Sequence, residues 1–166
     1  MDPGVALVTT ERLRLRRVTA ADAPALVAIS TDPHTNEHRP GGAPSRAQSN
    51  EIVNGFISDW EQHGIGYWVV EHLGTVIGIA GVRPIRLHGR DCWNLYYRFS
   101  PDSWGKGLAA EAARRALAAA RECDPTRPIV ARTRPDNVAA ARLAQTIGMT
   151  RSAEWDDHGF AAFVCS

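Results

Sequence analysis

The sequence predicts a mixed α/β fold in which a mostly antiparallel sheet of about seven strands is flanked by four helices. Runs rich in β-branched and aromatic residues alternate with segments of helical period, which is typical of that class. Two-residue turns at Leu73-Gly74 and His88-Gly89 favour antiparallel pairing of three successive runs. Because no linker or repeat divides the 166 residues, we expect one domain over 1–166, with 1–9 as a short N-terminal lead-in.

The strands are predicted by alternation and by runs of β-forming residues. Leu13 and Leu15 alternate with arginines, which indicates a strand with one buried face. The mainly apolar run 128–133 is typical of a strand buried on both faces. We expect strands over 11–18, 66–72, 75–87, 92–99, 128–133, 150–156 and 160–165.

The helices are predicted by capping signals and apolar stripes. Thr19 with Asp22, and Ser45 with Gln48, have the spacing of a capping box. Asn137 is a favoured N-cap residue for the helix that follows it. We expect helices over 20–31, 45–63, 105–123 and 137–147.

The segment 105–123 has the most regular helical pattern of the chain. Its leucines and alanines recur at helical spacing and predict one apolar face. Glu111 lies three or four residues before Arg114 and Arg115, so we expect it to pair with one of them.

Composition and charge exclude several function classes. Nineteen basic and eighteen acidic residues leave a net charge of +1, so we expect no nucleic-acid partner. Cys92, Cys123 and Cys165 are odd in number and form no Cys-x-x-Cys pair, so we expect neither a disulfide framework nor a metal site. The first ten residues lack the pattern of a signal peptide, and no apolar run approaches the roughly 20 residues that span a bilayer. We therefore expect a cytoplasmic protein with no membrane partner.

The turn before the helix 105–123 carries the clearest chemical signal. Gly105 and Gly107 allow positive φ and close approach of a ligand, and unpaired N–H groups at the helix start favour a bound diphosphate. Lys106 adds a positive charge there. A P-loop is excluded because a glycine follows the lysine, and Gly105, Gly107 and Ala110 give only a weak Rossmann spacing outside a βαβ unit. A glycine-rich helix start without a ligand is the structural alternative.

Residues 97–112 resemble the acetyl-CoA-binding segment of the GNAT N-acetyltransferase superfamily, in the form of its ribosomal-protein N-acetyltransferase (RimJ/RimL-like) branch. The family pattern R/Q-x-x-G-x-G/A is matched by residues 104–109, with Trp104 in the first position. A second resemblance lies within 134–149, and the likeness covers the chain from Thr10 onward. It implies a GNAT-type fold whose twisted central sheet is splayed at the CoA site.

The resemblance implies a cofactor site made largely of main chain. The N–H groups of 104–109 would hold the CoA pyrophosphate, and the strand 97–99 would hydrogen-bond the pantetheine arm. Asn137 would contact the pantetheine end, a role that is compatible with capping a helix. The implied acetyl-CoA-binding residues are Tyr97, Arg98, Phe99, Trp104, Gly105, Lys106, Gly107, Leu108, Ala109 and Asn137.

The chain departs from the family at the positions that carry acid–base chemistry. Asn94 stands where relatives of this branch often have Glu, Ala140 replaces the Ser of the second segment, and Ala144 replaces a Tyr. Because an amide cannot accept a proton, Asn94 is a catalytic candidate only as a residue that positions a water. His34 and His38 lie in the loop that covers the acceptor side in relatives and are candidates for contacting the substrate.

Two further pairs bear on the acceptor. Asp156 and Asp157 are candidates for attracting a cationic amine, with a charged turn as the alternative. Trp93 and Trp155 are candidates for the flat walls of an acceptor cleft, unless both rings lie in the core.

The resemblance implies an acetyl-CoA-dependent N-acetyltransferase that moves an acetyl group directly to an amine, either a protein N-terminus or a small molecule. We expect no covalent acyl-enzyme, because no cysteine lies in a recognisable His-paired setting. A homodimer is expected by analogy with the superfamily. The alternatives are a non-catalytic acyl-CoA-binding module of the same fold, which the three departures favour, and a plain nucleotide-binding domain.

Overall fold

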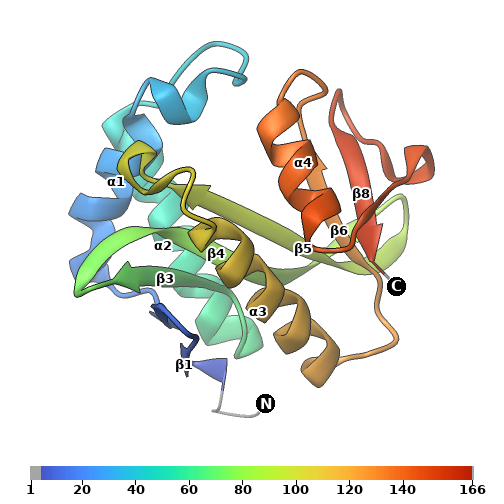
Figure 1. Ribbon diagram of the computed structural model, residues 1–166, viewed down its shortest axis with the longest axis horizontal. Helices are drawn as coiled ribbons and strands as arrows, with labels where there is room; N and C mark the ends of the chain where they lie inside the picture. The colour runs from blue at the N-terminus through green and yellow to red at the C-terminus, as the bar shows by residue number, and fades with distance from the viewer. Residues whose placement is uncertain (1–4, 166) are drawn as a thin grey trace.

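The computed structural model describes residues 5–165 as an eight-stranded sheet with helices on both faces (Figure 1). The strand order is β1-β2-β3-β4-β5-β6-β8-β7, and every neighbouring pair is antiparallel except β5 with β6. The predicted mixed α/β class is confirmed. The strands are β1 (Leu7–Thr9), β2 (Leu13–Arg17), β3 (Tyr67–His72), β4 (Thr75–Leu87), β5 (Arg90–Phe99), β6 (Ile129–Thr133), β7 (Thr150–Arg151) and β8 (Ala161–Cys165). The helices are α1 (Ala23–Thr31), α2 (Arg46–His63), α3 (Leu108–Cys123) and α4 (Val138–Thr146), with short 3₁₀ turns η2 (Ala20–Asp22), η3 (His34–Asn36), η4 (Pro101–Ser103) and η5 (Ala153–Trp155).

Different helices bury the two faces of the sheet, because side chains alternate along each strand. On β3, Tyr67 and Val69 pack in one cluster with Leu26 of α1 and Val53 of α2. Trp68 points to the opposite face and packs in the main core, to which α3 contributes most of its apolar side chains. In Figure 1, α3 lies in front of the sheet and α2 behind it.

The last three residues of the predicted lead-in, Leu7–Thr9, form an edge strand. β1 pairs antiparallel with β2 along its whole length. The Val5 carbonyl accepts a hydrogen bond of 2.6 Å from Trp68 Nε1, which fixes Val5 against the core. The sheet therefore has eight strands rather than about seven. Residues 1–4 and 166 of the expected domain lie outside the described residues.

Both predicted hairpin turns are confirmed. Leu73 (φ 50°) and Gly74 (φ 79°) occupy the left-handed region in succession, as do His88 (φ 49°) and Gly89 (φ 74°). Two successive residues with positive φ define the type I′ turn, whose twist matches that of the strands it joins.

Two element ends differ from the prediction. α3 begins at Leu108 rather than at 105, because the two glycines before it have positive φ, which an α-helix excludes. β7 ends at Arg151, because the chain then turns into η5 instead of extending to 156. No helix within residues 5–165 is long and apolar enough to cross a membrane.

β5 and β6 run parallel but separate part-way along their length. They pair only over 93–95 of β5 with 129–131 of β6, although β5 continues to Phe99 and β6 to Thr133. The sheet therefore opens between the C-terminal ends of these strands, as the predicted splay requires. In Figure 1, α4 lies on one side of the opening and the segment between α1 and α2 on the other.

Candidate functional site

Two adjoining cavities follow the opening between β5 and β6. The turn cavity, of about 460 Å³, lies beside the glycine turn and the start of α3. The inner cavity, of about 410 Å³, lies between β5, β6 and the start of α4. His38, Tyr97, Arg98 and Asn137 line both cavities, so the two form one continuous groove.

The glycine turn places free backbone donors along the turn cavity. Gly105 and Gly107 have φ of 74° and 75°, and a Cβ built on Gly105 would meet no atom within 4 Å. α3 starts immediately afterwards, and its first N–H to find a partner in the helix is that of Glu111, bound to the Gly107 carbonyl at 3.1 Å. The N–H groups of 108–110 precede it and have no intrahelical acceptor. This arrangement is suited to an anion, because the positive end of the helix dipole adds to the free donors.

A partly exposed ion pair between Arg12 and Glu111 holds the glycine turn in place. Arg12 Nε donates to Glu111 Oε2 at 2.7 Å, and Arg12 Nη1 donates to the Lys106 carbonyl at 2.8 Å. Burial opposes ionisation of Glu111, but hydrogen bonds from Thr10 and Arg12 outweigh it and lower the pKa of the carboxyl. The expected pairing of Glu111 with an arginine of its own helix is wrong, because the hairpin between β1 and β2 brings Arg12 to it.

The main chain of Tyr97 faces the opening. The N–H of Trp93 donates to the Pro128 carbonyl at 2.8 Å, and N–H groups of a strand point to the same side at every second residue. Tyr97 is four residues further on and lies beyond the last pair with β6, so its N–H and carbonyl point into the groove. Its hydroxyl donates to the Ala140 carbonyl at 3.1 Å, and burial raises the pKa of this phenol to about 12.

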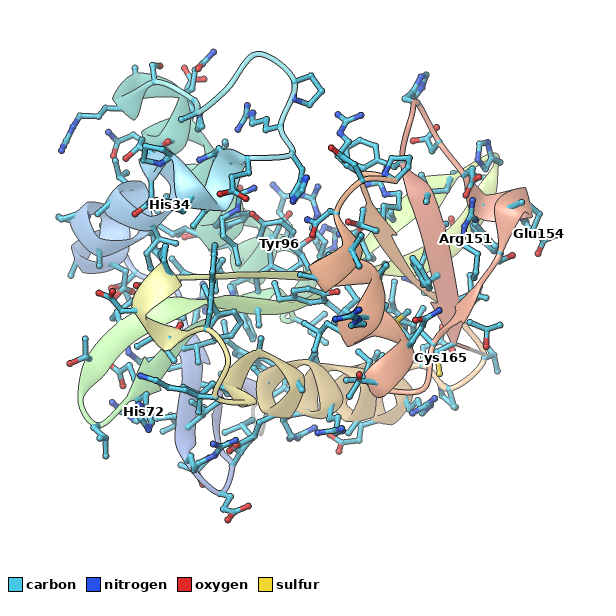
Figure 2. All side chains as sticks on the ribbon, turned by 45° about the horizontal axis from the view of Figure 1, so that its top comes forward. His34, His72, Tyr96, Arg151, Glu154 and Cys165 are labelled. Atoms are coloured by element: carbon cyan, nitrogen blue, oxygen red, sulfur yellow. The ribbon has the colours of Figure 1, made fainter. Side chains whose placement is uncertain are left out.

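Side chains from distant segments form the walls of the groove. Arg98 Nη1 donates to Asn36 Oδ1 at 3.1 Å, which fixes η3 against β5. Asn36 is buried and also donates to the Ser30 carbonyl at 2.7 Å. From the same segment, His38 Nδ1 lies 3.2 Å from Asp136 Oδ2, which joins this wall to the start of α4. In the view of Figure 2, Tyr96 lies between His34 on this wall and Arg151 near β8.

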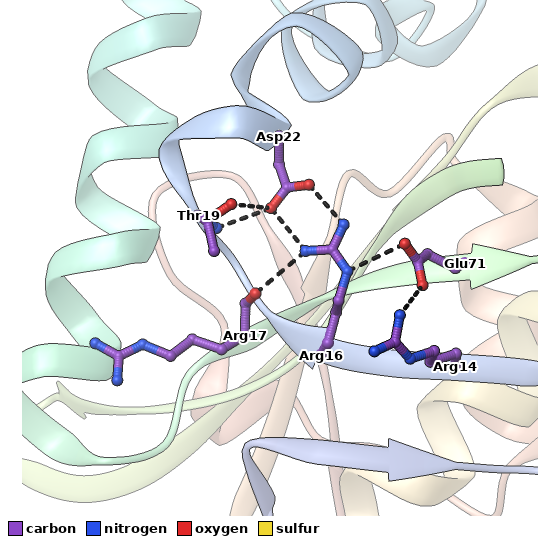
Figure 3. A network of polar contacts seen from close by, with 6 residues as sticks. All are labelled: Arg14, Arg16, Arg17, Thr19, Asp22 and Glu71. Carbon is purple, nitrogen blue, oxygen red and sulfur yellow. Dashed lines mark hydrogen bonds and ion pairs between the residues drawn. The ribbon is translucent and has the colours of Figure 1, made fainter. Parts of the chain in front are cut away.

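An ion pair between Arg16 and Asp22 holds the start of α1, the helix that leads to this wall (Figure 3). Arg16 of β2 donates to both carboxylate oxygens of Asp22, at 2.7 and 2.9 Å, and its Nε donates to Glu71 at 3.1 Å. The N–H of Thr19 also donates to Asp22 at 2.8 Å, as the predicted capping pair requires. Burial opposes ionisation of Asp22, but the hydrogen bonds from Arg16 and Thr19 outweigh it and lower its pKa.

The predicted cofactor residues come together at the turn cavity, with one exception. The lining includes all of Tyr97, Arg98, Phe99, Trp104, Gly105, Gly107, Leu108, Ala109 and Asn137. Lys106 is exposed, and its ammonium donates to the Asp102 carbonyl at 3.0 Å instead of pointing into the cavity. Asn137 also caps α4, because its Oδ1 accepts the Ala140 N–H at 3.1 Å.

Comparison with known proteins agrees with this geometry. The acetyltransferase (GNAT) domain family matches residues 12–150. The chain belongs to the GNAT acetyltransferase family. Its mixed sheet and four helices have the GNAT-type architecture that the resemblance predicted.

Three relatives illustrate the range of similarity to this GNAT chain. The uncharacterised protein YkkB of Bacillus subtilis (strain 168) is 28% identical over 145 residues, which cover 86% of this chain and 84% of YkkB. An acetyltransferase of known crystal structure from Agrobacterium tumefaciens is 25% identical, with a TM-score of 0.83 over 96% of this chain and 94% of its own. RimL, a ribosomal-protein α-N-acetyltransferase solved with coenzyme A, is 16% identical, with a TM-score of 0.74 over 96% of this chain and 97% of RimL. At that identity the likeness to RimL concerns the fold alone.

Asn94 lies beside the groove rather than in its lining. It is buried at 7% exposure and does not occur among the described residues that line either cavity. Its amide Nδ2 donates to the Tyr67 hydroxyl at 2.6 Å, and its Oδ1 accepts from Arg132 Nη2 at 3.4 Å. Burial raises the pKa of Tyr67 to about 12, so this phenol stays protonated. Both ends of the Asn94 amide are thus occupied by protein groups.

The two residue pairs considered for the acceptor side lie outside both cavities of the groove. Trp93 and Trp155 are each 4% exposed and lie in apolar clusters, so neither ring forms a wall of the groove. Asp156 is paired with Arg151 at 2.6 Å and Asp157 with Arg132 at 3.1 Å. Both aspartates line a neighbouring cavity that shares Arg134 and Phe160 with the inner cavity, so their attraction of a cationic amine stays a prediction.

Sequence reasoning missed the arginines of the inner cavity. Arg39, Arg132 and Arg134 line it, together with Phe160 of the C-terminal hairpin. They come from three segments that only the folded sheet brings together. No local signal marks Arg39 or Arg132 among the eighteen arginines of the chain. Arg134 begins the second segment that resembles the family, but nothing in that segment predicts it as a ligand-binding residue.

Proposed function

We propose that the chain is an acetyl-CoA-dependent N-acetyltransferase that transfers the acetyl group directly to an amine. The observation that supports this most strongly is the groove itself. A row of free backbone donors at the turn cavity leads past the unpaired N–H of Tyr97 into a second, differently lined cavity. One cavity suits an anionic cofactor, and the other is open to a second substrate.

The residues of the turn cavity fit the diphosphate and arm of CoA. The positive φ of Gly105 and Gly107 turns successive N–H groups toward the cavity, and no atom occupies the space where a Cβ on Gly105 would lie. The first N–H groups of α3 would add to that site. The Tyr97 main chain would hold the extended arm, and the Asn137 side chain lies near its end.

Acetyl-CoA supplies a thioester whose acetyl group passes to the amine, a C–N bond forming as the C–S bond breaks and the thiolate takes up a proton. The Tyr97 N–H is positioned to donate to the carbonyl oxygen as negative charge grows on it. Such a donor is worth several kcal/mol, about 2.7–4 in known oxyanion sites. The effect requires no side chain, which is consistent with the loss of the family's usual acid–base residues here.

The amine must lose a proton, and we infer that His38 accepts it. His38 lines both cavities at their junction, and imidazole is the side chain most often used as a general base near neutral pH. Asp136 lies 3.2 Å from its Nδ1, and no described residue forms a hydrogen bond with its Nε2. Asn94 acts as a positioning residue in this proposal, because it holds Arg132 at the inner cavity.

A melting experiment combined with a turnover assay tests the proposal. At a concentration 100 times its Kd, acetyl-CoA adds about 2.7 kcal/mol to native stability, which raises the melting temperature by about 5–10 °C. We expect that shift with acetyl-CoA and with CoA but not with ATP. We also expect thiol release together with a mass increase of one acetyl group on an added amine.

The other outcomes are equally informative. A shift with both CoA forms but no acetylated product from any amine would support the non-catalytic acyl-CoA-binding module. Absence of a shift at millimolar acetyl-CoA would mean that the glycine turn is purely structural.

A further inference from the structure

The inner cavity has a one-sided charge. Its charged lining consists of His38 and four arginines, and within residues 5–165 no aspartate or glutamate side chain lines it. The arginines are Arg39, Arg98, Arg132 and Arg134. Asp157 pairs with Arg132 and lines an adjoining cavity together with Asp156, so the positive charge that an acceptor amine would meet here comes from the arginines without a carboxylate partner.

Two of these arginines are already committed to protein partners. Arg98 donates to Asn36, and Arg132 is paired with Asp157 at 3.1 Å. The pairing of Arg132 is incomplete, because its Nε is buried without a hydrogen-bond partner among the described residues.

The other two arginines have no ion pair within the described part of the chain. Arg39 is exposed at the mouth of the inner cavity. Arg134 is half-buried, and its guanidinium carbon lies 3.8 Å from the centre of the Phe160 ring. Stacking of that kind holds the planar group in one orientation while its N–H donors stay free at the edges. Arg134 is thus a fixed and unoccupied anion donor.

We propose that the acceptor is an amine that carries an anionic group, a carboxylate or a phosphate, and that Arg134 binds this group with Arg39 and Arg132 beside it. This inference rests on the proposed acetyltransferase function. Arginine is suited to the task, because its fork of N–H donors matches both anions in bidentate geometry. The anionic group would offset the repulsion felt by the ammonium form. The positive surroundings would also favour loss of the proton that the amine must shed before it can attack.

The same arginines are poorly placed to bind the phosphates of CoA. Arg39, Arg132 and Arg134 line the inner cavity and are absent from the described lining of the turn cavity. The diphosphate site at Gly105 and Gly107 lies at the other end of the groove. Replacing Arg134 should therefore change recognition of the acceptor and leave that of acetyl-CoA intact.

The test compares matched acceptors that differ only in the anionic group. One arm uses α-amino acids and their α-amides, and a second uses 2-aminoethylphosphonate and ethylamine. A third arm uses the amidated tripeptides Ala-Glu-Glu and Ala-Gln-Gln, which distinguishes an acidic peptide N-terminus from a free small molecule. Each acceptor is assayed by thiol release and by the mass of the product.

Three proteins are compared: the wild type, Arg134→Gln and Arg142→Gln. Arg142 is an exposed arginine of α4 outside both cavities, so its replacement removes the same charge without touching the groove. In the wild type we expect kcat/KM to favour the anionic member of at least one pair by about 10- to 100-fold. Arg134→Gln should lose that preference with an unchanged KM for acetyl-CoA, and Arg142→Gln should keep it. If Arg134→Gln does not fold, Arg39→Gln replaces it in the test and should lose part of the preference for the anionic acceptor.

The outcomes separate the two proposals. Turnover with equal kcat/KM for anionic and neutral acceptors overturns this inference and leaves the acetyltransferase function standing. An anion preference that survives in Arg134→Gln and in Arg39→Gln also overturns it. If acetyl-CoA binds but no acceptor is turned over, the inference is tested by the melting shift that each member of an acceptor pair causes in the CoA-bound protein. An equal shift for both members then counts against the inference, and the lack of turnover counts separately against the function.

Discussion

The two cavities of the groove are built on opposite principles. The groups that the turn cavity offers to an anion are mainly backbone: two glycines with positive φ, the free N–H groups of a helix start and the main chain of an unpaired strand. The inner cavity is made of side chains, which reach it from the segment after α1, from β6 and from the C-terminal hairpin. A backbone site can persist while side chains change, whereas a side-chain site depends on each residue that forms it. We therefore propose the turn cavity for the cofactor and the inner cavity for the acceptor.

The largest effect on turnover is expected at the junction of the cavities. In our proposal His38→Gln removes the proton acceptor, and loss of a general base lowers kcat by about 10²–10⁴-fold. The melting shift with acetyl-CoA should persist, because the backbone donors of the glycine turn do not depend on His38. His72→Gln, at the hairpin between β3 and β4, removes a histidine outside both cavities and should behave as the wild type. A His38→Gln enzyme with full kcat and an unaltered pH–rate profile would exclude His38 as the base.

A second, smaller effect tests whether the turn cavity acts through its backbone. Gly105→Ala places a methyl group in the open space beside the first donors of α3, at a φ of 74°. Gly89 has the same φ of 74° and equally open surroundings, but it lies in a hairpin turn away from the groove. Both alanines carry the same left-handed strain of about 1–2 kcal/mol.

The melting temperatures of the two variants should therefore fall together, while only Gly105→Ala loses affinity for acetyl-CoA. A blocked contact worth about 1.4 kcal/mol corresponds to a tenfold rise in Kd. Calorimetric titration with acetyl-CoA measures this difference. Equal affinity of the two variants would show that the glycine at 105 serves the turn alone and not a ligand.

The sequence predicted the turn cavity but not the inner cavity. The fold and the turn cavity were readable because glycine spacing, caps and hairpin turns are local, and the main-chain site requires no distant partner. The inner cavity was not readable, since Arg39 and Arg134 come together only after β6 has paired beside β5. The same reason explains the wrong partner of Glu111. Helical spacing suggested a neighbour on its own helix, and the sheet supplied Arg12 instead.

The smallest effects are expected at two ion pairs, Arg12–Glu111 beside the turn cavity and Arg16–Asp22 at the base of α1. A variant of one ion pair is the control for a variant of the other. Glu111→Gln weakens the hold of Arg12 on the glycine turn, so the KM for acetyl-CoA should rise about fivefold, which corresponds to roughly 1 kcal/mol of a lost charge-assisted hydrogen bond. Asp22→Asn loosens the base of α1, whose far end leads to the wall that carries His38. It should raise the KM of the acceptor by a smaller factor and leave that of acetyl-CoA unchanged.

The pH dependence of the free energy of unfolding tests Asp22 and Glu111 a second time. The pKa of each carboxyl is lowered by the fold, so the native state holds these protons less tightly than the unfolded chain does. Each ion pair therefore contributes its full stability above the ordinary carboxyl pKa and loses it as the pH falls through the lowered value. The wild type should lose stability over that acid range more steeply than either variant, which a melting series from neutral to acid pH measures. If Asp22→Asn and Glu111→Gln shift the KM of the same substrate, the two cavities depend on the same ion pairs, and the contrast between a backbone site and a side-chain site fails.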